Sequence, residues 1–189
     1  MALWYKNDSR RASIMLFFRN NAILAGLLFL GQTVLASAAS PDAAEPLLKP
    51  AALTDASALE QLRQAAESHD PEALYRLGAL VFDGKLVRKD LAQAADLLKR
   101  AADKDHAPAR NAYGYMLQHG AGVAKNEQEA ALWYERAAVA GDREAQNNLG
   151  WFYQEGEGVE RNLDLAVNWY SKAAAAGSVI AAWHLGRLY

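Results

Sequence analysis

The sequence predicts an all-α fold, an α/α solenoid of helix-turn-helix repeats. The first supporting observation is a fixed period of 36 residues, which is typical of solenoids. Glycines recur at this interval, at Gly78, Gly114, Gly150 and Gly186. Alanines recur five positions before them, at Ala73, Ala109, Ala145 and Ala181. The second observation is the composition, which is 52% hydrophobic with no cysteine and favours a helical protein without disulfides.

Residues 1–38 have a different pattern, which indicates a secretory signal peptide. A leader with four basic residues precedes the short apolar run 22–30, and Ala36-Ser37-Ala38 has the small residues of a cleavage site. We therefore expect a periplasmic protein. The alternative is an uncleaved inner-membrane anchor, although residues 22–39 would barely span a bilayer. Residues 39–53 hold three prolines among small residues and are expected to form an extended linker.

The solenoid is expected over residues 54–189. It has full repeats at 71–106, 107–142 and 143–178, and partial repeats at 54–70 and 179–189. Each period divides into two helices. Helix A is expected to begin after an N-cap residue, at Asp70, His106, Asp142 or Ser178, and to end at Gly84, Gly120 or Gly156. Helix B is expected to begin after another N-cap residue, at Thr54, Asp90, Asn126 or Asn162.

Gly150 lies inside a predicted helix A, where glycine costs about 1 kcal/mol relative to alanine. It borders an apolar stripe made of Ala145, Leu149, Phe152 and Tyr153. We interpret Gly150 as the point where a neighbouring helix approaches closely, so that packing offsets the cost. In helix B, residues at helical spacing predict the buried side, at Ala130, Trp133, Tyr134, Ala137 and Ala138.

These residues also carry a family resemblance. The pattern A-x-x-x-L-G-x-x-Y-x-x-G-x-G-V, a cap, and then A-x-x-W-Y-x-x-A-A-x-x-G fits residues 145–177 at nearly every position. It resembles the Sel-one-like repeat (SLR), a relative of the tetratricopeptide repeat. Residues 107–142 match well, whereas 71–106 match more loosely, with Leu97-Leu98 in place of the Trp-Tyr pair. The resemblance implies a right-handed α-solenoid that binds other proteins, often in bacterial envelopes.

No motif indicates catalysis or a cofactor. The G-x-G sequences in GAGVA and GEGVE lack the lysine and the serine or threonine of a P-loop. The four histidines include no pair at metal-ligand spacing on one helix face, so we expect surface or capping roles. Residues 1–38 hold four of the 20 Lys and Arg residues and one of the 22 Asp and Glu residues, so their removal leaves a net charge of −5. Such a charge does not favour nucleic acid. We therefore expect no enzyme, no metal and no small-molecule substrate.

The side of helix A opposite its apolar stripe is the predicted partner-binding face, because helix A lines the concave groove in solenoids of the resembled type. Its positions follow from the helical period of 100° per residue. They are aromatic or amide residues for the most part, namely Tyr75, Asn111, Tyr115, Gln118, Asn147, Trp151, Gln154, Trp183 and Arg187. Such residues give contact area with polar groups and suit a peptide or protein partner. The alternative is that neighbouring helices bury some of these rings.

The leading hypothesis is a non-enzymatic protein–protein interaction module or adaptor in the bacterial cell envelope. A second hypothesis is a membrane-tethered regulator that uses the same groove and contacts the membrane only through an uncleaved N-terminal segment. A third is an envelope component that binds peptidoglycan or polysaccharide, because aromatic rings also stack on sugars.

Overall fold

The computed structural model describes residues 56–188, and every regular element in this range is an α-helix. The chain divides into two compact units, residues 1–64 and 65–189. Most of α4 (Ala56–Glu67) belongs to the first unit, and its Ala58 and Leu62 are buried. The second unit contains α5 (Pro71–Asp83), α6 (Leu91–Ala102), α7 (Ala107–His119), α8 (Glu127–Val139), α9 (Arg143–Glu155), α10 (Leu163–Ala175) and α11 (Val179–Leu188).

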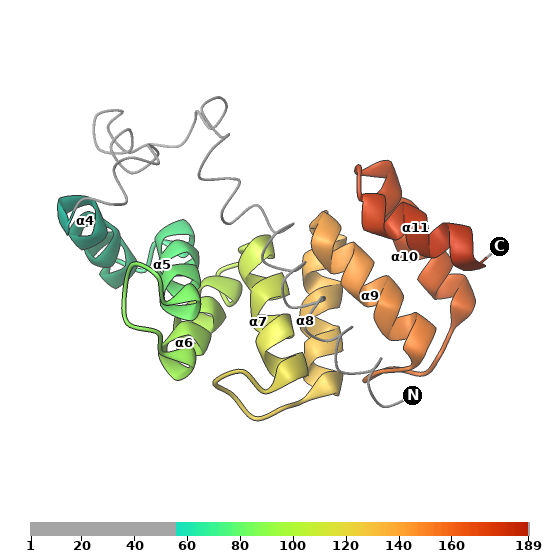
Figure 1. Ribbon diagram of the computed structural model, residues 1–189, viewed down its shortest axis with the longest axis horizontal. Coiled ribbons are helices and arrows are strands. Elements are labelled where there is room, and N and C mark those ends of the chain that lie inside the picture. The colour runs from blue at the N-terminus through green and yellow to red at the C-terminus, as the bar shows by residue number, and fades with distance from the viewer. Residues whose placement is uncertain (1–55, 189) are drawn as a thin grey trace. The chain divides into compact units, whose positions relative to one another are not determined.

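The helices of the second unit pack in chain order, as Figure 1 shows. Helix A of each repeat packs on its own helix B, which gives the pairs α5–α6, α7–α8 and α9–α10. Each helix B also packs on the helix A that follows it, as in α6–α7, α8–α9 and α10–α11. This arrangement, in which neighbours in sequence are neighbours in space, is that of an α/α solenoid, and the predicted fold class is confirmed.

The helix boundaries in the described range follow the predicted caps. The side chains of Asp70 and Asp142 each accept a hydrogen bond from a backbone N–H three residues on, at 2.7 Å. His106 uses Nδ1 in the same way, at 3.2 Å from the amide nitrogen of Ala109. Helix B begins after Asp90, Asn126 or Asn162, each of which also accepts such a bond. The glycines that close helix A adopt the left-handed conformation predicted for C-caps.

The core lies between helix A and helix B. Of the predicted stripe on α9, Ala145, Leu149 and Phe152 are buried, whereas Tyr153 is only half-buried. All five predicted core residues of α8 are buried. Tyr134 of α8 lies between repeats, because its ring packs edge-on against Phe152 of α9 at 5.1 Å between centroids. One tyrosine therefore contributes to the core of two successive repeats.

Gly150 has the close contact that the sequence predicted. A Cβ atom added there would lie 2.8 Å from the Tyr170 ring of α10, the partner helix B. Gly158 has a second role that periodicity alone did not predict. Its φ is +66°, and an added Cβ would overlap the backbone oxygen of Glu127, the first residue of α8. The loop after α9 therefore packs against the preceding helix B.

Three predictions lie outside the described residues: the signal peptide at 1–38, the linker at 39–53 and the cap at Thr54. Among the helices within 56–188, none is long and apolar enough to cross a membrane.

Candidate functional site

The predicted partner-binding face contains an amide cluster where α7 and α9 meet. Asn111 of α7 is only 3% exposed, and its Oδ1 accepts a hydrogen bond from Nδ2 of Asn148 on α9 at 2.9 Å. This bond joins helix A of one repeat to helix A of the next. Asn111 was predicted to contact a partner; in the structure its oxygen also holds two successive repeats together.

Asn147, beside this pair, has an unsatisfied acceptor. Its Oδ1 atom is shielded from solvent and has no hydrogen-bond partner, although the residue as a whole is only half-buried. Oε1 of the neighbouring Gln146 is also unsatisfied, while its Nε2 donates to the carbonyl of Ala138 at 3.2 Å. A buried carbonyl without a donor costs about 1–3 kcal/mol. Each of these two atoms, in adjacent residues of α9, can accept a hydrogen bond from a donor outside the protein, such as water or a partner.

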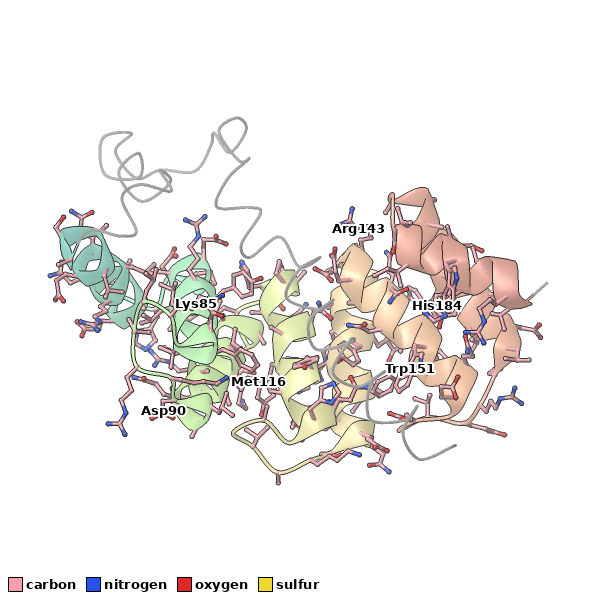
Figure 2. All side chains as sticks on the ribbon, viewed as in Figure 1. Lys85, Asp90, Met116, Arg143, Trp151 and His184 are labelled. Carbon is pink, nitrogen blue, oxygen red and sulfur yellow. The ribbon has the colours of Figure 1, made fainter. Side chains whose placement is uncertain are left out.

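Two aromatic residues in the next column of the face are less open than the sequence predicted. Tyr115 was expected on the exposed side of α7, but it is 7% exposed and its ring packs edge-on against Phe82 of α5. Burial raises the pKa of Tyr115 to about 12. Trp151, labelled in Figure 2, is half-buried and packs against the apolar cluster around Tyr170. The helical wheel placed both residues opposite the stripe, but Phe82 of the preceding repeat packs on Tyr115, and Trp151 packs on a cluster formed mainly by α10 of its own repeat.

The two predicted glutamines hydrogen-bond to tyrosines inside their own repeat. Oε1 of Gln118 accepts from the Tyr134 hydroxyl at 2.8 Å, and Oε1 of Gln154 accepts from the Tyr170 hydroxyl at 3.1 Å. Both bonds join helix A to helix B. The side-chain oxygens of Gln118 and Gln154 therefore stabilise the fold, and this holds independently of what their amide nitrogens contact.

The remaining predicted residues lie at the two ends of the face. Tyr75 is half-buried, with its ring centroid 4.9 Å from that of His106, and burial raises its pKa. Trp183 on α11 is 57% exposed, and the guanidinium of Arg187 lies 4.7 Å from its ring centroid. A cation at this distance over an indole is a favourable contact.

A polar edge at the start of the A helices was not predicted. His106 Nε2 and Glu72 Oε2 are 2.9 Å apart, so the N-cap of α7 bonds to the first turn of α5. The hydrogen bond from His106, together with the charge of Arg76, lowers the pKa of Glu72 to about 2. Nearby, burial raises the pKa of the Asp142 cap to about 6. Glu72 and His106 are 34 positions apart, so they occupy different columns of the 36-residue repeat. Periodicity alone therefore does not pair them.

Surface or capping roles were predicted for the histidines; His106 has a capping role, whereas His184 has a packing role. His106 is an N-cap, and His184, labelled in Figure 2, stacks on Tyr170 with 4.7 Å between ring centroids. Within residues 56–188 no group of three or more His, Asp or Glu side chains is arranged to hold a metal ion.

Comparison with known proteins agrees with this architecture. The Sel1 repeat model matches residues 71–106, 107–142 and 143–178. A Sel1 repeat protein from Oxalobacter formigenes is 37% identical, with 68% of this chain and 97% of that chain covered and a TM-score of 0.63. A protective antigen of uropathogenic Escherichia coli strains, which displays an SLR fold, is 40% identical with a TM-score of 0.63, covering 65% of this chain and 26% of that chain.

A third solved structure, the Helicobacter pylori cysteine rich protein B, shares the fold at 23% identity and a TM-score of 0.55, with 67% of this chain and 96% of that chain covered. No curated protein matches significantly. Sel1 repeat proteins generally mediate protein–protein interactions, on a scaffold that is generally non-enzymatic. The repeat period, the capped helix pairs and the family model together establish that this chain belongs to the Sel1 repeat family.

Proposed function

We propose that this protein is an interaction module of the bacterial cell envelope that binds an extended segment of a partner protein along the face of its A helices. The family supports a protein partner. The basic leader, apolar run and Ala36-Ser37-Ala38 sequence support export to the periplasm. In the proposed complex the amides and rings of α7, α9 and α11 contact the partner.

The observation that carries this proposal is the unsatisfied Oδ1 of Asn147. Every residue of an extended peptide except proline offers a backbone N–H, so a partner segment supplies the missing donor. Because Asn147 is half-buried rather than enclosed, we propose that its side chain rotates to present this amide to the partner. The flanking Trp151 provides an apolar surface for a side chain of the same segment.

The amide cluster offers a matched pair of variants. Asn147→Ala removes an acceptor that has no partner in the fold, so we expect stability equal to or above that of the parent. Asn148→Ala removes the donor to the buried Oδ1 of Asn111, so we expect a loss of about 1–3 kcal/mol. The proposal predicts the opposite order for binding, in which Asn147→Ala loses the partner and Asn148→Ala keeps it.

The experiment is crosslinking in intact cells followed by mass spectrometry, with the two variants and the parent compared at a temperature where all are folded. Loss of a protein crosslink in Asn147→Ala alone supports the proposal. Equal crosslinking by Asn147→Ala and the parent would overturn it. Capture of peptidoglycan or polysaccharide in place of protein would favour the glycan-binding hypothesis, because the same rings stack on sugars.

The envelope location has its own test. The chain should be recovered from the periplasmic fraction with its N-terminus near Ala39. Recovery of the uncut chain in the membrane fraction would support the tethered regulator instead.

A further inference from the structure

The N-cap of α7 differs in chemistry from the caps of the two neighbouring A helices. His106 caps α7 through Nδ1, which accepts from the amide nitrogen of Ala109 at 3.2 Å, whereas the carboxyl groups of Asp70 and Asp142 cap α5 and α9. A carboxyl group keeps an oxygen that accepts a hydrogen bond whether or not the group is protonated. An imidazole nitrogen accepts only through its lone pair, so the cap at His106 exists only while Nδ1 carries no proton.

Two hydrogen bonds define the tautomer of the His106 ring. Because Nδ1 accepts from Ala109, the proton of the neutral ring lies on Nε2. Nε2 then donates to Oε2 of Glu72 on α5 at 2.9 Å. The neutral ring therefore makes one bond to α7 and one bond to α5, and it joins the second repeat to the first.

The amide of Ala109 depends on this cap. Ala109 is the third residue of α7, and the helix itself offers no carbonyl to an amide in its first turn. The residue is fully buried, so water does not replace the ring as the acceptor. A buried donor without an acceptor is unfavourable, so loss of the His106 cap destabilises the first turn of α7.

The ionisable groups of α5 and α9 that face His106 include one fixed negative charge in direct contact. The hydrogen bond from His106 and the charge of Arg76 lower the pKa of Glu72 to about 2, so Glu72 stays ionised where histidines titrate. The ring of Tyr75 lies 4.9 Å from that of His106 between centroids, and it stays neutral because burial raises its pKa. Burial raises the pKa of Asp142, the cap of α9, to about 6, and a charge on His106 opposes this rise.

The other charged residues beside this joint are paired with one another. Arg110 of α7 pairs with Asp105, and its Nε donates to the carbonyl of Ala102 at the end of α6 at 3.2 Å. On α9, Arg143 pairs with Glu144 at 2.7 Å. Glu72 is therefore the group that attracts a positive charge on the His106 ring most directly.

We propose that His106 is a pH-dependent switch at the joint between the first two repeats. A proton added at Nδ1 gives an imidazolium that no longer accepts from Ala109, while Nε2 keeps its bond to Glu72 as an ion pair. The ring then contacts α5 alone, and the first turn of α7 opens. This turn directly precedes Asn111, which bonds to Asn148 of the next repeat, so its opening loosens the contacts on both sides of α7. The switch needs no partner, so the inference goes beyond the proposed function.

Hydrogen exchange of single backbone amides in the full-length chain tests the switch. It is measured by NMR between about pH 8 and about pH 5, the range in which histidine usually changes charge, and is corrected for the intrinsic rate at each pH. We expect protection of the Ala109 amide to fall by about fivefold, which corresponds to the usual cost of a lost N-cap. The amides of Ala73 and Ala145 are controls within the same molecule, because carboxyl groups cap them, and they should stay protected.

Two variants separate the switch from a general effect of acid. His106→Asn keeps a capping oxygen but does not ionise, so the Ala109 amide should be equally protected across the range. Glu72→Gln keeps an acceptor for Nε2 without its charge, so the loss of protection should move to lower pH. In the parent, the midpoint of this loss should coincide with the titration of the His106 ring resonances.

Three results would overturn the proposal. The first is protection of the Ala109 amide that does not change across this range in the parent. The second is the same loss of protection in His106→Asn. The third is an equal loss at Ala73 and Ala145, because acid would then act on the whole fold rather than on the cap of α7.

Discussion

Replacing Gly150 with alanine measures how tightly helix A and helix B are packed. Alanine is favoured over glycine by about 1 kcal/mol in a helix, so the substitution stabilises wherever space is free. At Gly150, however, the new Cβ would lie 2.8 Å from Cδ1 of Tyr170, well inside the optimal separation of two carbon atoms. Tyr170 is fully buried and its hydroxyl is bonded to Gln154, so its ring has little freedom to withdraw.

Overpacking of this kind costs about 1–3 kcal/mol, which outweighs the gain in helix propensity. We therefore expect Gly150→Ala to lower the free energy of unfolding by up to about 2 kcal/mol, and Gly150→Leu to lower it further. Gly186→Ala is the matched control, because it gains propensity without a clash and should stabilise by up to about 1 kcal/mol. Urea unfolding followed by circular dichroism measures both. Equal stabilisation by the two alanines would refute the close contact at Gly150.

Three further predictions concern stability. His69 has a φ of +65°, at the position where later repeats have Gly141 and Gly177, so His69→Gly should raise the melting temperature and stabilise by about 0.5–1 kcal/mol; a lower melting temperature would contradict this. Gln118→Leu leaves the buried Tyr134 hydroxyl without an acceptor and should cost about 1–3 kcal/mol, most of which Tyr134→Phe should restore in a double-mutant cycle. Burial raises the pKa of Asp142 from 3.8 to about 6 in the folded chain, so the folded state binds the carboxyl proton of Asp142 more tightly than the unfolded state. Protonation of Asp142 therefore stabilises the fold at low pH, and this stabilisation is lost as the pH rises from about 4 through 6. Asp142→Asn keeps a capping oxygen but does not ionise, so thermal melts at pH 4 and pH 7 should show the parent losing stability relative to this variant; an unchanged difference would refute the shift.

The sequence predicted local features of this fold well, because they depend on few residues. An N-cap needs one side chain and one amide three positions on, so Asp90 and Asn162 could be assigned from spacing alone. The buried side of α8 followed in the same way from the helical period. The role of Gly158 could not be predicted fully, since its contact is with the start of α8, some thirty residues earlier in the chain.

The partner-binding face was harder to predict because a helical wheel describes one helix at a time. It places Tyr115 opposite the apolar stripe of α7, but Phe82 on α5 packs against that side. It places Asn147 on this face but not the adjacent Asn148, although it is Asn148 that bonds to Asn111. Both features arise between repeats, where the rotation of one helix pair relative to the next decides which side chains meet. The assignment of these residues to partner binding stays a prediction.

The loosely matching first repeat differs from the others in a chemically consistent way. In repeats two and three a buried tyrosine hydroxyl donates to a glutamine, as Tyr134 does to Gln118. At the two equivalent positions the first repeat has Leu98 and Phe82, so the donor and the acceptor are absent together. A buried hydroxyl needs an acceptor, and a polar acceptor without its donor would gain nothing from the contact. The pair therefore changes as a unit, and the first repeat keeps the helix A–helix B contact in apolar form.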